Sequence, residues 1–223
     1  ELWLLMGSDM FLTLQDWREP QRVMSMAHIG AFSRRKDGEE AVFARQKAFL
    51  EREFGADVTI IAGCGIHNCG TQESRHDGIH SFFVGKNARV RYIEKHYGEG
   101  DGNGENVMNP TTIVDLGENA YMEMETTQIK GIDSTIRDTK AHLTDGATLI
   151  IKEKIMTHGH QHAETNFSVD LDGYESSTNV ISRSVAKDHS TQMFNSNIRG
   201  NNKCAGHSEC DAIIMDLSLI HIS

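Results

Sequence analysis

From Ala56 onward, hydrophobic and polar residues alternate in short segments, a pattern that predicts β-strands. Three of these segments share one outline, in which an apolar stretch is followed by a turn, an alanine and an alternating strand. They are residues 83–93, 114–124 and 141–151. A fourth, weaker copy begins at residues 169–174. Repetition of one small unit indicates that each copy adds a layer to a common core.

The aligned alanines of the three copies, Ala88, Ala120 and Ala147, lie 32 and 27 residues apart. Intervals of this length are typical of solenoid proteins, in which each repeat supplies one coil. A β-sandwich would also contain short alternating strands, but these usually recur about every 8 to 12 residues with hairpin turns between them. The repeat period therefore favours an all-β parallel β-helix over a sandwich.

Residues 1–54 have a different pattern, and part of this segment predicts a helix. Between residues 39 and 54 the apolar side chains fall on one helical face, and the other face carries charged residues. The apolar face consists of Val42, Phe43, Phe49, Leu50 and Phe54. We expect this amphipathic helix to pack against or cap the domain that follows.

The two ends of the chain lead to an expectation about its organisation. The chain starts at Glu1 and breaks off after Asp216 without a turn or capping signal, so we expect a C-terminal truncation. Residues 217–223 look like the in-frame translation of a transposon end used in sequencing libraries, and we expect them to be a non-native, adapter-derived tail. The predicted parts are an N-terminal segment (1–54), the β-helix core (55–216) and this tail (217–223).

Composition and charge exclude several classes of protein. A formal charge of −10 repels a nucleic-acid backbone, so we expect no nucleic-acid partner. The apolar stretches fall short of the about 20 residues that cross a bilayer, and no signal peptide opens the chain. Four cysteines without a secretion signal indicate cytosolic thiols rather than a disulfide framework. We therefore expect a cytoplasmic protein that is not attached to a membrane.

Two cysteine clusters are candidates for binding iron or zinc. Cys64, His67 and Cys69 lie within six residues of a glycine-rich segment, where soft ligands could converge. Cys204, His207 and Cys210 form a similar group further along the chain. A pair of cysteines with this spacing is a weak signal, and small buried thiols would give the same sequence.

A third cluster consists of histidines at every second position, His158, His160 and His162. On an extended strand these three imidazoles would share one face, where they could bind a metal or relay protons. Gly159 weakens a regular strand, so exposed histidines in a turn are the alternative. The chain contains no phosphate-binding loop, nucleophile elbow or zinc-protease helix, so we do not expect it to be an enzyme.

Several motifs together resemble the SufB/SufD family of iron–sulfur cluster assembly proteins, in its short, single-gene branch. The resemblance covers about residues 56 to 216 in order. The motifs are residues 56–70, 77–80, 95–100, 124–131, 157–160, 180–188 and 206–215.

This resemblance implies a right-handed parallel β-helix and a scaffold subunit that receives sulfur and iron and carries a transient iron–sulfur cluster. It also implies a SufC-type ATPase, a sulfur-donor system and a homologous SufB/SufD subunit, or a second copy of the chain, as partners. ATP hydrolysis and release of sulfur from cysteine would then belong to the partners. The helical C-terminal segment that binds the ATPase in the family has no counterpart here.

The residues carried over from the family are few. Cys210 matches the family's Cys-Asp motif, and His160 with Gln161 matches its Gly-His-Gln motif. Cys64, Cys69 and Cys204 are branch-specific candidates for cluster binding, and His160, His162 and His207 are candidates for metal binding. At Asp115 and Leu116, where the SufB branch has a sulfur-accepting cysteine, this chain has none.

Two other functions remain open at this point. The first is a structural, SufD-like dimerisation subunit without its own cluster. The second is a β-solenoid enzyme that acts on polysaccharide, for which the alternating carboxylates offer slight support, although no aromatic sugar-binding platform accompanies them.

Overall fold

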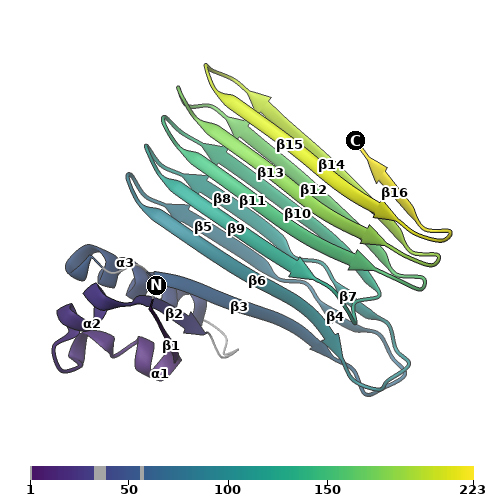
Figure 1. The fold of residues 1–223 in the computed structure, drawn as a ribbon, viewed down its shortest axis with the longest axis horizontal. Helices are drawn as coiled ribbons and strands as arrows, with labels where there is room; N and C mark the ends of the chain where they lie inside the picture. The colour runs from purple at the N-terminus through teal and green to yellow at the C-terminus, as the bar shows by residue number, and fades with distance from the viewer. Residues whose placement is uncertain (1, 33–38, 56–57) are drawn as a thin grey trace. The chain divides into compact units, whose positions relative to one another are not determined.

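A computed structural model describes residues 2–32, 39–55 and 58–223 (Figure 1). The chain forms two compact units, residues 1–63 with 90–94 and residues 64–89 with 95–223, and each is described by itself. Within the described ranges, no helix has both the length and the apolar character needed to span a membrane.

The first unit combines short helices with a parallel sheet in the order β1-β2-β3. Its elements are β1 (Trp3–Gly7), α1 (Ser8–Phe11), the 3₁₀ helix η1 (Leu14–Asp16), α2 (Pro20–Met26), β2 (His28–Phe32), α3 (Glu39–Phe54) and β3 (Val58–His67). Pro20 occupies the first turn of α2, where its missing N–H has no intrahelical partner to lose.

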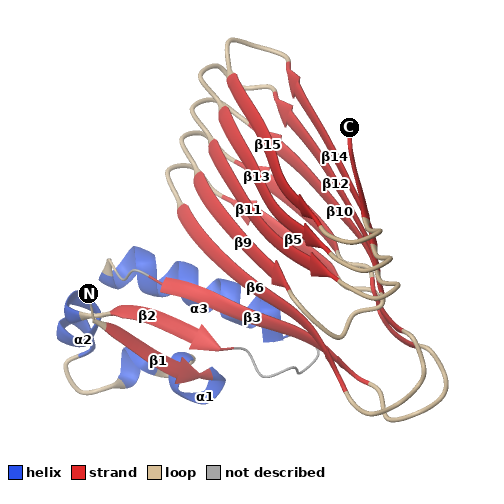
Figure 2. Cartoon of the chain, turned by 45° about the vertical axis from the view of Figure 1, so that its right-hand side comes forward, coloured by secondary structure: helices blue, strands red, loops and turns tan. Residues whose placement is uncertain are grey.

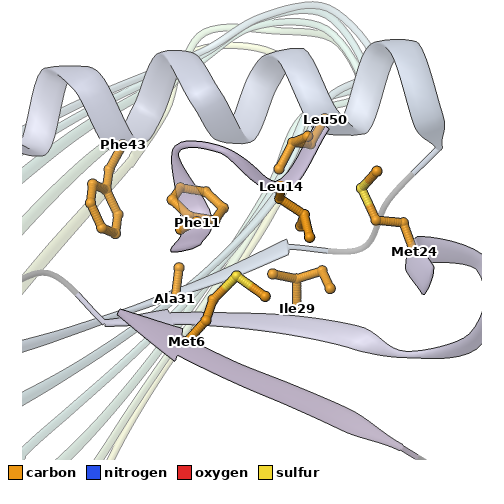
Figure 3. Close-up of a cluster of buried hydrophobic side chains, with 8 residues drawn as sticks. All are labelled: Met6, Phe11, Leu14, Met24, Ile29, Ala31, Phe43 and Leu50. Carbon is orange, nitrogen blue, oxygen red and sulfur yellow. The ribbon is translucent and has the colours of Figure 1, made fainter. Parts of the chain in front are cut away.

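A cluster of buried apolar side chains holds this unit together (Figure 3). It is made of Met6, Phe11, Leu14, Met24, Ile29, Ala31, Phe43 and Leu50. The rings of Phe11 and Phe43 lie 4.8 Å apart at a tilt of 41°, so helices α1 and α3 meet through an aromatic contact.

The predicted helix is present as α3, but its buried face differs from the expected one. Phe43 and Leu50 are buried, and Phe49 and Phe54 pack partly against the cluster. Val42 is exposed, so its place on the buried face was wrong. Phe43 and Leu50 are seven residues apart and project in nearly the same direction from an α-helix, whereas Val42 lies about 100° away from Phe43.

The second unit consists almost entirely of strands (Figure 2). Its strands are β4 (Ser74–His76), β5 (Ile79–Val84), β6 (Arg89–Glu99) apart from residues 90–94, β7 (Asn106–Met108), β8 (Thr111–Leu116), β9 (Tyr121–Gln128), β10 (Ser134–Leu143), β11 (Thr148–Thr157), β12 (His162–Leu171), β13 (Ser177–Ala186), β14 (Thr191–Gly200), β15 (Ala205–Ile214) and β16 (Leu219–Ile222).

These strands alternate between two parallel sheets. One sheet contains β6, β9, β11, β13 and β15 in that order, and the other contains β10, β12, β14 and β16 in that order. Pairing is parallel and in register over ten residues from β11 to β13 and from β12 to β14. Inward and outward side chains alternate along β11, β12 and β13. The expected all-β parallel solenoid with an N-terminal helical segment is confirmed.

The repeated alanines lie at equivalent corners of the solenoid. Ala120 and Ala147 are buried and directly follow residues with positive φ, Asn119 and Gly146. In the fourth copy Ser176 takes the alanine's place. All three donate a backbone hydrogen bond to the carbonyl three residues before them. The expected boundaries at residues 54 and 216, and the expected origin of residues 217–223, remain predictions.

Candidate functional site

The interior of the solenoid between the two sheets has a mostly apolar half and a half rich in polar side chains, although Ile155 lies within the polar half and Thr178 within the apolar half. Strand β11 contributes to both, with buried Leu149 and Ile151 near its start and buried Glu153 further along. The buried residues of the apolar half include Met122, Met124, Ala141, Leu143, Leu149, Ile151, Val169, Leu171 and Val180. The buried residues of the polar half include Gln128, Thr135, Arg137, Glu153, Thr157, Thr165, Ser182, Ser184, Ser190 and Gln192.

An ion pair between the two sheets lies in the polar half. Arg137 of β10 donates from one terminal nitrogen to Glu153 Oε1 of β11 at 2.8 Å, and from the other to Gln128 Oε1 at 3.0 Å. Both charged side chains are nearly inaccessible, with relative exposures of 6% and 3%. Burial of two charges carries a large desolvation cost, which is offset only when their remaining hydrogen-bonding groups are satisfied.

Hydroxyl groups complete the surroundings of the Glu153 carboxylate. Thr165 donates to Oε1 at 3.1 Å, and Ser182 donates to Oε2 at 3.0 Å. Both carboxylate oxygens therefore accept hydrogen bonds from buried donors. Glu153 is consequently an acceptor for three buried donors.

Cys210 continues this network toward the next strand. Glu153 pairs with Ser182 across β11 and β13, and Ser182 pairs with Cys210 across β13 and β15, so all three side chains project into the interior. Burial raises the pKa of the Cys210 thiol, the negative charge of Glu153 adds to this effect, and hydrogen bonds with Ser184 and Ser182 oppose it. Cys210 is half-buried, with a hydroxyl-lined inner side.

Cys69 lies in a different setting. It follows the end of β3 and is exposed, and its Sγ lies 3.0 Å from Nε2 of His67. Cys64 lies in β3, and its side chain is outside the part of the chain that the structure describes.

The three cysteines whose side chains are described do not form one site. Cys204 precedes β15 and Cys210 lies six residues further along it, a separation of about 20 Å at the rise of a strand. Asn68, next to Cys69, bonds to the end of β6, and β6 lies four strands from β15, or about 19 Å. A role for each cysteine stays a prediction, but they cannot share one metal ion in this arrangement.

Of the two alternatives for His158, His160 and His162, a shared strand face or a turn, the turn is the one that occurs, and metal binding by these histidines stays a prediction. The chain turns between β11 and β12, and Gly159 adopts a φ of +61°, which an extended strand does not allow. The ring of His160 stacks on His189 at 5.4 Å instead. Nδ1 of His162 lies 2.8 Å from Thr191 Oγ1.

His207 projects from the outer face of β15, away from the inward-facing Cys210. Its Nε2 lies 3.3 Å from Glu209, which also pairs with Arg183 at 2.7 Å. The hydrogen bond with His207 and the contact with Arg183 lower the pKa of the Glu209 carboxyl group. At a separate position, a hydrogen bond from Asn201 and the proximity of His142 lower the pKa of the Asp172 carboxyl group. No group of three or more histidine, cysteine or acidic side chains arranged for a metal ion occurs among the described residues.

Sequence reasoning missed Arg137, Glu153 and Ser182, although a signal for Glu153 was present. Every second residue of β11 from Leu149 to Ile155 faces inward, and Glu153 is the one charged residue among the apolar ones in this series. A charge at such a position predicts a buried partner.

Comparison with known proteins agrees with this architecture. The family model described as SUF system FeS cluster assembly, SufBD core domain, matches residues 34–218. No curated protein matches the chain. Because the match covers most of the sequence and the parallel solenoid that it contains, the chain belongs to the SufBD core family of SUF-type iron–sulfur cluster assembly.

Proposed function

We propose that this protein is a cytoplasmic, non-enzymatic scaffold subunit of a SUF-type system, on which an iron–sulfur cluster is assembled as cargo. The proposal includes a SufC-type ATPase, a sulfur donor and a homologous SufB/SufD subunit or second copy as partners. It is supported by membership of the SufBD core family.

The observation that carries the proposal is the position of Cys210. Its thiol faces the interior beside Ser182 and Ser184, next to the network built on Arg137 and Glu153. Iron is bound by thiolates, and a half-buried thiol with nearby hydroxyl donors provides a sheltered ligand. Burial holds the thiol in its neutral form, so iron binding at Cys210 would release a proton.

Anaerobic reconstitution with ferrous iron and sulfide tests the proposal. We expect the parent chain to bind iron and to develop visible absorption of a cluster, and we expect C210S to lose most of both. The C204S variant is the matched control, since Cys204 is close in sequence but lies outside the interior network. Serine preserves the size and hydrogen bonding of the thiol, so a loss reports on ligation.

Full cluster binding by C210S would contradict the role of Cys210. If neither the parent chain nor any variant binds a cluster, the structural SufD-like subunit becomes the better explanation. Dimerisation with a homologous SufB/SufD subunit would then still be expected, because that is the role of a structural subunit.

A further inference from the structure

Helix α3 carries a second apolar row of side chains beside the row that is buried in the first unit. Phe43 and Leu50 point from α3 into the buried cluster (Figure 3). Val42 and Phe49 each precede one of these residues by one position, so they form a parallel row about 100° around the helix. Val42 is 43% exposed, and Phe49 is only partly buried. The first unit therefore leaves its second apolar row incompletely covered.

A groove of about 380 Å³ lies beside this second row. Its lining residues, all from the first unit, are Leu12, Val42, Arg45, Gln46 and Phe49. Val42 and Phe49 are two helical turns apart, or about 10 Å along the axis of α3. Apolar positions with this separation match the spacing of apolar side chains on one face of an amphipathic helix. The groove is therefore suited to a second helix that lies along α3.

The walls of the groove are held in place by contacts within the first unit. The side-chain amide of Gln46 donates to the carbonyl of Phe11 at 3.0 Å and also to Gln15. The ring of Phe49 packs edge-on against Phe54, with the ring centres 5.9 Å apart. Both amide hydrogens of Gln46 are thus engaged, and its side-chain oxygen stays available as an acceptor for a bound partner.

Charge indicates which kind of helix fits the groove. Lys47 pairs with Glu51, and Arg52 pairs with Glu53. Arg45, the remaining basic residue of α3, is exposed at the groove and forms no ion pair with any residue that the structure describes. A guanidinium group is matched by a carboxylate, with which it can form two parallel hydrogen bonds. The groove therefore combines an apolar surface with an unpaired positive charge.

We propose that this groove docks an acidic, amphipathic helix of a partner protein. Apolar side chains on one face of the partner helix pack against Leu12, Val42 and Phe49, and a carboxylate beside them pairs with Arg45. This docking explains why the apolar side chain of Val42 stands exposed on α3. The proposal concerns the first unit alone and goes beyond the assembly role proposed for the solenoid.

Binding of two synthetic peptides to the full chain, followed by fluorescence anisotropy, tests this proposal. Both are fluorescein-labelled helical peptides of about 15 residues with leucines at positions i, i+3 and i+7. One carries glutamates beside the leucines, and the other carries lysines at the same positions. We expect the full chain to bind the glutamate peptide and not the lysine peptide, because Arg45 attracts a carboxylate and repels an ammonium group.

Variants of the groove sharpen this test. R45Q should weaken binding of the glutamate peptide about fivefold, the effect of losing one ion pair at the edge of an interface. V42D should weaken it about tenfold or more, because it places a carboxylate against the apolar side chains and acidic residues of the peptide. R45E should bind the lysine peptide in preference to the glutamate peptide, a reversal that a folding defect cannot produce.

The R52Q variant is the matched control, because Arg52 is an exposed basic residue of the same helix that lies outside the groove and is paired with Glu53. Its affinity for the glutamate peptide should equal that of the parent chain. Binding of neither peptide, equal binding of both, or unchanged affinity in R45Q and V42D would overturn the proposal.

Two further results would assign the groove to another occupant and would also overturn the proposal. The first is binding of the parent chain, but not of R45Q, to vesicles of anionic phospholipid. The second is self-association of the parent chain that V42D abolishes in sedimentation experiments. Peptide binding needs neither iron nor sulfide, so its outcome does not depend on cluster reconstitution, and the two proposals fail separately.

Discussion

The two halves of the solenoid interior are built on the same strands but are stabilised by different interactions. In the apolar half, Leu149 and Leu171 exclude water and need only close packing. In the polar half, Arg137 and Glu153 are equally inaccessible, and each needs a partner for its charge. The comparison teaches that the polar half is a connected network, in which removal of one member affects those that remain.

Removal of Arg137 should have the largest effect on stability. R137M leaves the Glu153 carboxylate buried without its counter-charge, and we expect a loss of about 3 to 5 kcal/mol in the free energy of unfolding, measured with urea. The double variant R137M/E153M should recover much of this loss, since neither charge is then buried. A loss below about 1 kcal/mol in R137M would show that water reaches the pair and that the two halves differ less than described.

Truncation in the apolar half should have a somewhat smaller effect. L149A removes a fully buried side chain from β11, and we expect a loss of about 2 to 4 kcal/mol from lost burial and the remaining cavity. I150A, on the outer face of the same strand, is the control and should cost about 1 kcal/mol or less. Similar losses in both variants would contradict a packed apolar half.

The C210S substitution should have the smallest effect on the free energy of unfolding, and this effect should be visible only at alkaline pH. The folded-state pKa of Cys210 is raised because burial disfavours the thiolate. The stability that this group contributes is therefore fully present below the unfolded-state pKa and is lost as the pH rises through the folded-state pKa. C210S should lose less stability than the parent in urea titrations between about pH 8 and pH 10.

Both chains should show the same slope of stability against pH between about pH 6 and pH 7, where the thiol is protonated in the folded and unfolded states. A constant offset in the free energy of unfolding between the two chains in this range would report a packing effect of the substitution, whereas a difference in slope would contradict the assignment to thiol ionisation.

Much of the solenoid could be predicted because its signals are local and repeated. Ala120 and Ala147 mark corners that each coil must turn, and alternation in β11 and β13 reports which side chains face inward. The helix α3 was predicted for the same reason. The exposure of Val42 was not predicted, because the spacing of apolar residues along the helix does not decide which of two adjacent rows of side chains is buried.

The site was harder to predict because its contacts are distant in sequence. Arg137 meets Glu153 from the opposite sheet, and Ser182 reaches Glu153 from the next coil, so their pairing depends on register. The turn at Gly159 was one of two alternatives for the histidine run, but its effect, which is to place His160 beside His189 of the following coil, could not be predicted from sequence. Sequence motifs identified Cys210 as a candidate but contained no information on its neighbours.

The spacing of paired residues has a consequence for how such chains change over generations. Tyr121 pairs with Thr148, Thr148 with Ser177, and Ser177 with Ala205, so successive coils differ in length while their strands stay aligned. The differences are absorbed at the corners. Gene insertions or deletions of one or two codons should therefore survive at corners and be eliminated within strands, where one extra residue would turn every following side chain to the wrong face. Corners are equally the places where a peptide tag could be grafted into the coil.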